Sequence, residues 1–160
     1  MSNSELNFKN ELIQKLREGD NEEYPNFLKY YNLMEDYIKK EKLNNAKGMT
    51  NHSIVHINNV LKNMNKILSN NIFDISINSL YYLLIASIIH DLAMNNYDIR
   101  REEHHSAIVH IIQDIREHNT DYERILSEEE DKIICDIASS HSGNAEESYN
   151  YIINEYKCRG

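Results

Sequence analysis

Hydrophobic residues recur three or four positions apart along most of the chain, which is the period of an α-helix that buries one face. The pattern predicts helices over about 5–18, 24–38, 50–69, 78–94, 100–117, 127–141 and 145–157. Only four glycines and one proline are present among the 160 residues, too few for the many turns of an all-β fold. We therefore expect an all-α protein, a single-domain bundle of about seven or eight helices.

The segment from Leu80 to Ile89 is apolar on every side, so we expect it to be the central buried helix. It is much shorter than the ~20 apolar residues that cross a membrane, and the N-terminus lacks the basic start and apolar run of a signal peptide. The two cysteines have no C-x-x-C spacing, and Cys135 lies among isoleucines as a core thiol would. We expect a soluble protein of the reducing cytoplasm without a membrane partner.

Aromatic residues dominate the second predicted helix. They form a stripe at helical spacing: Phe27, Tyr30, Tyr31, Met34, Tyr37 and Ile38. Such a stripe belongs either to the core or to a surface that meets a partner, so an oligomer contact through this helix is one interpretation. We expect residues 1–49 to form a helical extension that packs on a domain formed by residues 50–160.

The formal net charge of −9 repels phosphate backbones, which disfavours binding to double-stranded nucleic acid. The same charge suits a site that takes up divalent cations, because each bound ion cancels two negative charges.

Histidines occupy positions that favour such a site. His52 and His56 are four residues apart, on one side of the third predicted helix and close to its buried seam. His90 and Asp91 end the most apolar helix, where an unpaired ionisable pair would be costly to bury. The C-terminal end of a helix carries partial negative charge, so a bound cation would make this position favourable.

Three further histidines fall at helix ends. His104 and His105 open the fifth predicted helix on the side of its isoleucines, and His141 ends the sixth, whereas His110 and His118 are expected on the surface. Imidazole and carboxylate ligands without thiolate favour Mn, Fe, Zn or Ni, and also Mg where water completes the shell. We expect one or two divalent metal ions.

This order of residues resembles the HD superfamily of metal-dependent phosphohydrolases. Residues 51–60 are similar to its first metal-ligand helix, 83–91 to its signature helix, and 101–106 and 137–142 to later histidine positions of members with two metals. The resemblance spans about Thr50 to Ser142. It implies an HD-type helical domain over residues 50–160, with His56, His90 and Asp91 as ligands of the first ion. His104 or His105, with His141, would hold the second.

The resemblance also implies roles for two further residues. The His52-x-x-x-His56 spacing is similar to that of cyclic-nucleotide phosphodiesterases, where the earlier histidine donates a proton, so His52 is a candidate general acid. In the alternative, His52 binds the metal and His56 lies behind it. Arg101, or Arg100, is placed to pair with a phosphate, although a surface ion pair is the simpler interpretation. The implied substrate is a nucleotide or another small phosphate ester.

The chain departs from the family at one ligand. HD proteins supply a further Asp late in the domain, and no Asp follows His141 here. Either the chain is a fragment truncated at its C-terminus, or it is a catalytically incomplete HD-like module that binds a nucleotide or a partner. A di-iron helical protein is a third hypothesis, since Glu102-x-x-His105 matches a motif of ferritin-like bundles, but the motif has no second copy.

Overall fold

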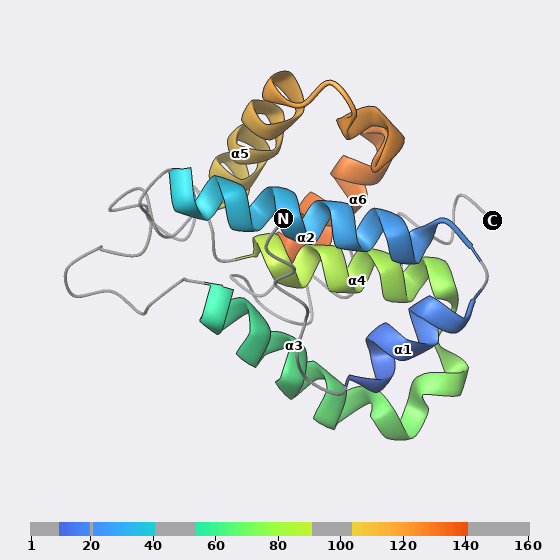
Figure 1. Cartoon of the computed structure of the whole chain (residues 1–160). Coiled ribbons are helices and arrows are strands. Elements are labelled where there is room, and N and C mark those ends of the chain that lie inside the picture. The colour runs from blue at the N-terminus through green and yellow to red at the C-terminus, as the bar shows by residue number, and fades with distance from the viewer. Residues whose placement is uncertain (1–9, 20, 41–53, 91–103, 141–160) are drawn as a thin grey trace.

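The computed structural model describes residues 10–19, 21–40, 54–90 and 104–140, with His104 and His105 as backbone only. These residues form helices and no strand, as the hydrophobic period predicts (Figure 1). The elements, in chain order, are α1 (Glu11–Glu18), α2 (Glu23–Lys40), α3 (Ile54–Leu68), the 3-10 segment η2 (Ser69–Asp74), α4 (Ile77–Ile89), α5 (His104–His118), the 3-10 turn η5 (Tyr122–Arg124) and α6 (Glu128–Ser139).

The expected count of seven or eight helices is slightly too high for the described part of the chain, which contains six α-helices. The helix expected over 145–157 lies outside the described residues.

The loop expected after α3 is instead helical, because η2 continues the chain as 3-10 turns with a kink at Asn71. The Lys15 amino group of α1 donates hydrogen bonds to the carbonyl oxygens of Ile72 and Ile75, which satisfies two backbone acceptors at the end of η2.

Helix α4 is the centre of the molecule, as its all-round hydrophobicity predicts. The residues from Leu84 to Ile89 are all buried, and α4 packs against α1, α2, α3 and α6 (Figure 1). Helix α5 packs chiefly against α6, so it forms the outer arm of the bundle.

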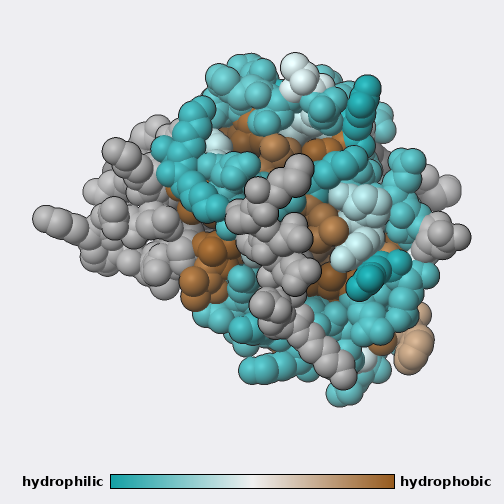
Figure 2. Space-filling view, in the orientation of Figure 1, coloured by the Kyte–Doolittle hydropathy of each residue, from teal (hydrophilic) through white to brown (hydrophobic). Residues whose placement is uncertain are grey.

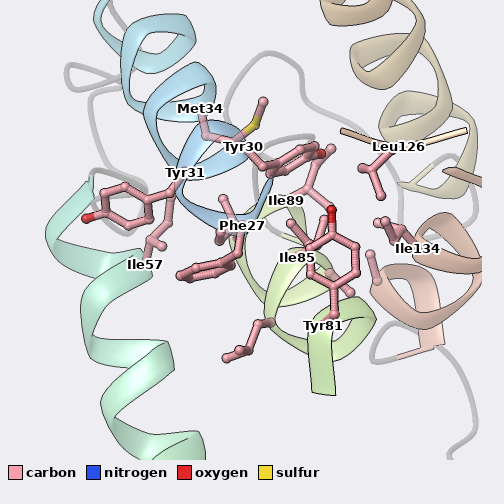
Figure 3. Close-up of a cluster of buried hydrophobic side chains, with 14 of the residues drawn as sticks. Phe27, Tyr30, Tyr31, Met34, Ile57, Tyr81, Ile85, Ile89, Leu126 and Ile134 are labelled. Carbon is pink, nitrogen blue, oxygen red and sulfur yellow. The ribbon is translucent and has the colours of Figure 1, made fainter. Parts of the chain in front are cut away.

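The aromatic stripe of α2 lies in the core. Figure 3 shows its side chains directed between α3, α4 and the α6 side of the bundle, where Tyr30 meets the ring of Tyr122 edge-on at 6.2 Å between centroids. The stripe members Phe27, Tyr30, Tyr31, Met34 and Ile38 are all buried. The core interpretation of this stripe is therefore correct, and an oligomer contact through it has no support.

Helix α3 lies across α4 with one narrow buried seam. Ile57 and Leu61 are buried, and Met64 and Leu68 are half-buried beside them. Ile67, which the periodicity places on the inner face, is 72% exposed, so that expectation is wrong. Ile67 lies six residues after Leu61, which turns its side chain about 120° away from the seam.

Side chains cap the first turns of two helices. The cap at Ser127 agrees with the sequence, whereas the helix predicted over 5–18 begins only at Glu11, after its cap Asn10. Ser127 and Glu130 form a capping box at the start of α6, in which each side chain accepts from the other residue's backbone N–H. Asn10 caps α1 through a hydrogen bond from the backbone of Ile13, and its amide also donates to the Leu61 carbonyl oxygen at 3.1 Å. The cap of α1 thus also fastens it to α3.

Hydrophilic residues cover most of the face shown in Figure 2, with hydrophobic ones visible between them near its middle. Within the described ranges, no helix combines the length and the hydrophobicity that a membrane crossing requires.

Cys135 on α6 is a buried core thiol, as its isoleucine neighbours predict. Burial, together with the nearby carboxylate of Asp131, raises its pKa to about 12. An ordinary thiol has a pKa of about 8.5, so at about pH 8 the folded protein holds roughly 10³-fold less Cys135 thiolate.

We predict that Cys135 resists alkylation in the folded protein. In a Cys158→Ser variant, which leaves Cys135 as the single thiol, iodoacetamide should react slowly under native conditions and rapidly in concentrated urea. Mass spectrometry follows the modified fraction with time. Equal rates in the two conditions would show that Cys135 is not buried.

Candidate metal centre

The structure brings together two of the histidines that the sequence singles out. His56 lies in the first turn of α3, and His90 directly follows α4 as its C-terminal cap. Their ring centroids are 6.0 Å apart, with the ring planes inclined by 30°, and both residues are half-buried. One ion bound about 2.0–2.1 Å from a nitrogen of each imidazole would place the ring centres roughly 5–6 Å apart.

The end of α4 fixes the orientation of His90. Its backbone N–H donates to the Ala86 carbonyl oxygen at 2.9 Å, and its ring Nδ1 lies 2.7 Å from the Ser87 carbonyl oxygen. A carbonyl only accepts, so Nδ1 carries the proton when it makes this bond. This is how a protein commonly orients an imidazole that binds metal.

A polar contact joins α3 and α4 near the histidine pair, about one turn before His90 on α4 and two turns after His56 on α3. The Ser87 hydroxyl donates to the Leu83 carbonyl oxygen of its own helix, and its oxygen also lies against the Met64 sulfur of α3. Ser87 is buried, and it interrupts an otherwise apolar run. Sequence reasoning did not select Ser87, although a lone hydroxyl three residues before a candidate ligand was a usable signal.

A hydrogen bond also joins α2 to α3. The Tyr31 hydroxyl donates to Asn58 Oδ1 at 2.8 Å, two residues after His56. Burial raises the pKa of Tyr31 above its ordinary value, so the hydroxyl remains protonated and the bond persists throughout the neutral range. Further along α3, Asn65 Oδ1 accepts from the backbone N–H groups of Glu11 and Leu12. Hydrogen bonds from two helices thus fix the position of α3.

Helix ends gather at one side of the bundle. The N-terminal ends of α3 and α5 and the C-terminal end of α4 lie toward the left in Figure 1. Helix α5 begins at His104, and α6 returns from the connection at the far end of α5.

Other predicted site residues are not placed. His52, Asp91, Arg101 and His141 lie outside the described residues, as do the side chains of His104 and His105. Among the side chains that the structure does describe, no three His, Cys, Asp or Glu residues are grouped closely enough to hold a metal ion. The histidine pair is therefore the described portion of the candidate site. His110 and His118 are exposed, as expected.

A comparison with family models found one that covers most of the chain. The model described as HD-CE, an HD-type domain family, matches residues 34–159. The chain belongs to the HD-CE family. The match begins within α2, includes α3 to α6, and contains every residue proposed above for the site. The sequence-based assignment to an HD-type helical domain is thus confirmed at the level of the domain.

Neither the curated proteins nor the solved structures include a significant match to this chain.

A second polar cluster, which sequence reasoning also did not select, lies at the opposite end of α5. Asp131 in the first turn of α6 is 8% exposed and pairs with Arg116 of α5. A detectable signal was present, because Asp131 precedes the buried Ile134 and Cys135 by three and four residues and therefore shares their face.

We predict that Tyr31→Phe lowers the free energy of unfolding by about 1 kcal/mol, because it removes the hydrogen bond that holds Asn58. Urea denaturation followed by circular dichroism measures the change. Tyr24→Phe is the matched control, since the described residues supply its hydroxyl with no hydrogen-bond partner. Equal stability of the two variants would show that the α2–α3 bond contributes nothing.

Proposed function

We propose that this HD-CE protein is a metal-dependent phosphohydrolase that acts on a nucleotide or another small phosphate ester. The observation that carries the proposal is the close approach of His56 on α3 and His90 at the end of α4, whose ring centroids lie 6.0 Å apart. A family match over residues 34–159 supports it, because the HD-type domain is compatible with this chemistry.

The donor chemistry of the pair fits a divalent ion. Two half-buried imidazoles, one on α3 and one at the end of α4, offer nitrogen ligands of the kind that first-row divalent ions accept. His90 also ends α4, where the helix dipole favours positive charge, and the chain carries a net charge of −9. In this proposal Asp91 completes the first site with His56 and His90.

A second ion would be held by His104 or His105 together with His141. His104 is the first residue of α5, and His141 follows the cap of α6 by one position. Because α6 reverses the direction of α5, these two ends return to the same side of the hairpin. Manganese, iron, zinc and nickel suit such ligands, as does magnesium with additional water.

One or two bound ions would lower the pKa of a water molecule enough to supply hydroxide at neutral pH. The residues of the chain would do the rest. His52 would donate a proton to the departing oxygen of the ester, and Arg101 would hold a phosphoryl oxygen pair in its planar fork.

We predict that His56→Ala and His90→Ala each lower the hydrolytic activity by more than about 100-fold. Loss of a residue that only orients a metal ligand typically costs roughly 10–100-fold, and loss of a ligand itself should cost more. The test uses the purified chain with Mn²⁺ and bis(p-nitrophenyl) phosphate, followed by a panel of nucleotides, with metal content measured by mass spectrometry. His118→Ala is the matched control, because His118 is exposed and bonds only within its own helix.

Two outcomes would count against the hydrolase. A wild-type chain without metal and without turnover contradicts it, as does a His90→Ala variant that retains both. Binding of metal and nucleotide without turnover would instead support the alternative, an HD-like module that binds a nucleotide but does not hydrolyse it.

A further inference from the structure

A buried ion pair fastens the C-terminal end of α5 to the first turn of α6. Asp131 Oδ2 accepts from Arg116 Nε at 3.0 Å and from Nη2 at 2.6 Å, a two-pronged arrangement that fixes the guanidinium plane. The other carboxylate oxygen of Asp131 accepts from the Tyr122 hydroxyl at 2.8 Å. Both oxygens of this buried carboxylate are therefore engaged, each by a different element.

Arg116 extends the cluster to the connection between the two helices. Its Nη2 also donates to the Leu126 carbonyl oxygen at 3.0 Å, and its Nη1 pairs with Glu123. The guanidinium carbon lies 4.7 Å from the centroid of the Tyr122 ring, in the range of a cation–π contact. Through the edge-on contact of Tyr122 with Tyr30, the cluster reaches α2 and the core.

The other described side chains of α5, from Ser106 onward, make no comparable directional contact with another helix. Its inward residues Ile108, Ile111, Ile112 and Ile115 are buried, and the helix packs chiefly against α6. Hydrophobic contact depends on area and not on direction, so it tolerates a small rotation of one helix against another. Hydrogen bonds weaken steeply when their angle changes, so the cluster resists that rotation.

The length of α5 magnifies any change in its direction. At 1.5 Å per residue, the helix rises about 18 Å between Arg116 and His104. A rotation of roughly 10° about the ion pair would therefore move the start of α5 by about 3 Å, whereas a metal or catalytic site tolerates errors of only about 0.5 Å.

We propose that Arg116 and Asp131 are positioning residues that set the direction of α5 and thereby place its N-terminal histidines relative to His90. The metal-binding part of this inference rests on the proposed function. The part concerning the direction of α5 rests on the described contacts alone.

Buried ion pairs contribute little net stability compared with apolar residues of similar size, although loss of one partner is costly. The double variant Arg116→Met with Asp131→Leu is therefore the informative one, since it removes the directional bonds and leaves no unpaired charge in the interior. Glu123, which loses its contact with Arg116, is 64% exposed to solvent. The matched control is Arg124→Met with Asp121→Leu, because that pair lies 3.5 Å apart on the surface with both side chains more than three-quarters exposed.

The first measurement is the distance between nitroxide labels at Ser106→Cys on α5 and Asn59→Cys on α3, both exposed, in metal-free protein with Cys158→Ser. Pulsed electron paramagnetic resonance should give one narrow distance in the parent and in the surface-pair control. The Arg116/Asp131 double variant should stay folded, with the circular-dichroism spectrum of the parent, and give a shifted or broadened distance. An unchanged narrow distance in that variant would overturn the proposal.

The second measurement is a titration with Mn²⁺ by isothermal calorimetry, without substrate. In the Arg116/Asp131 double variant the second Mn²⁺ site, which would include His104 or His105, should lose at least 10-fold in affinity, while the site that contains His56 and His90 keeps its affinity. Unchanged affinity at both sites would refute the metal-binding part even if the label distance broadens. Absence of Mn²⁺ binding in the parent would instead contradict the proposed function, and the label distances would still decide the direction of α5.

Discussion

Residues 84–89 of α4 are buried on every side, and this burial determines where the surrounding helices lie. A helix that is apolar around its whole circumference must be covered from every direction, and α1, α2, α3 and α6 provide that cover. Each fully buried Leu or Ile contributes roughly 1.5–3 kcal/mol relative to exposure, so separation of any covering helix from α4 would be costly. The polar residue that ends such a helix, His90, is thereby held at a defined place where the core stops.

Hydrophobic packing alone does not determine the angles between the helices that surround His90. Side-chain hydrogen bonds between the elements supply the direction in the described part of the chain. Asn10 and Asn65 join α1 to α3, Tyr31 joins α2 to α3, and Tyr81 of α4 donates to the Ile125 carbonyl oxygen ahead of α6. Together with the Arg116–Asp131 pair, these bonds join the hydrophobic helices into a frame in which the angles between helices are fixed.

Several features of this frame follow from sequence in a direct physical way. The apolar run of α4, the isoleucine stripe of α5 and the capping box at Ser127 are local patterns, and local patterns determine which residues form helices and which faces are buried. Prediction of the approach of His56 to His90 required more than local patterns. Each histidine could be placed on its helix from periodicity, but only the resemblance to HD proteins paired the two helices.

Other features depend on long-range contacts that a single sequence does not encode visibly. Ile67 has the same apolar character as Leu61, and only the narrowness of the α3 seam leaves it exposed. Whether the Tyr-rich stripe of α2 faced a partner or the core depended on which helices surround it. The partner of Asp131 is fifteen residues away across a connection whose course the helical period does not determine.

The central claim is that α3 and α4 present His56 and His90 to one metal ion. Anomalous X-ray diffraction from crystals grown with Mn²⁺ tests it most directly, because the anomalous signal locates the ion independently of any assumption about its ligands. We expect an anomalous peak within bonding distance, about 2.0–2.3 Å, of a ring nitrogen of both histidines. A peak located elsewhere, or both rings ordered in the presence of Mn²⁺ with no peak between them, would contradict it.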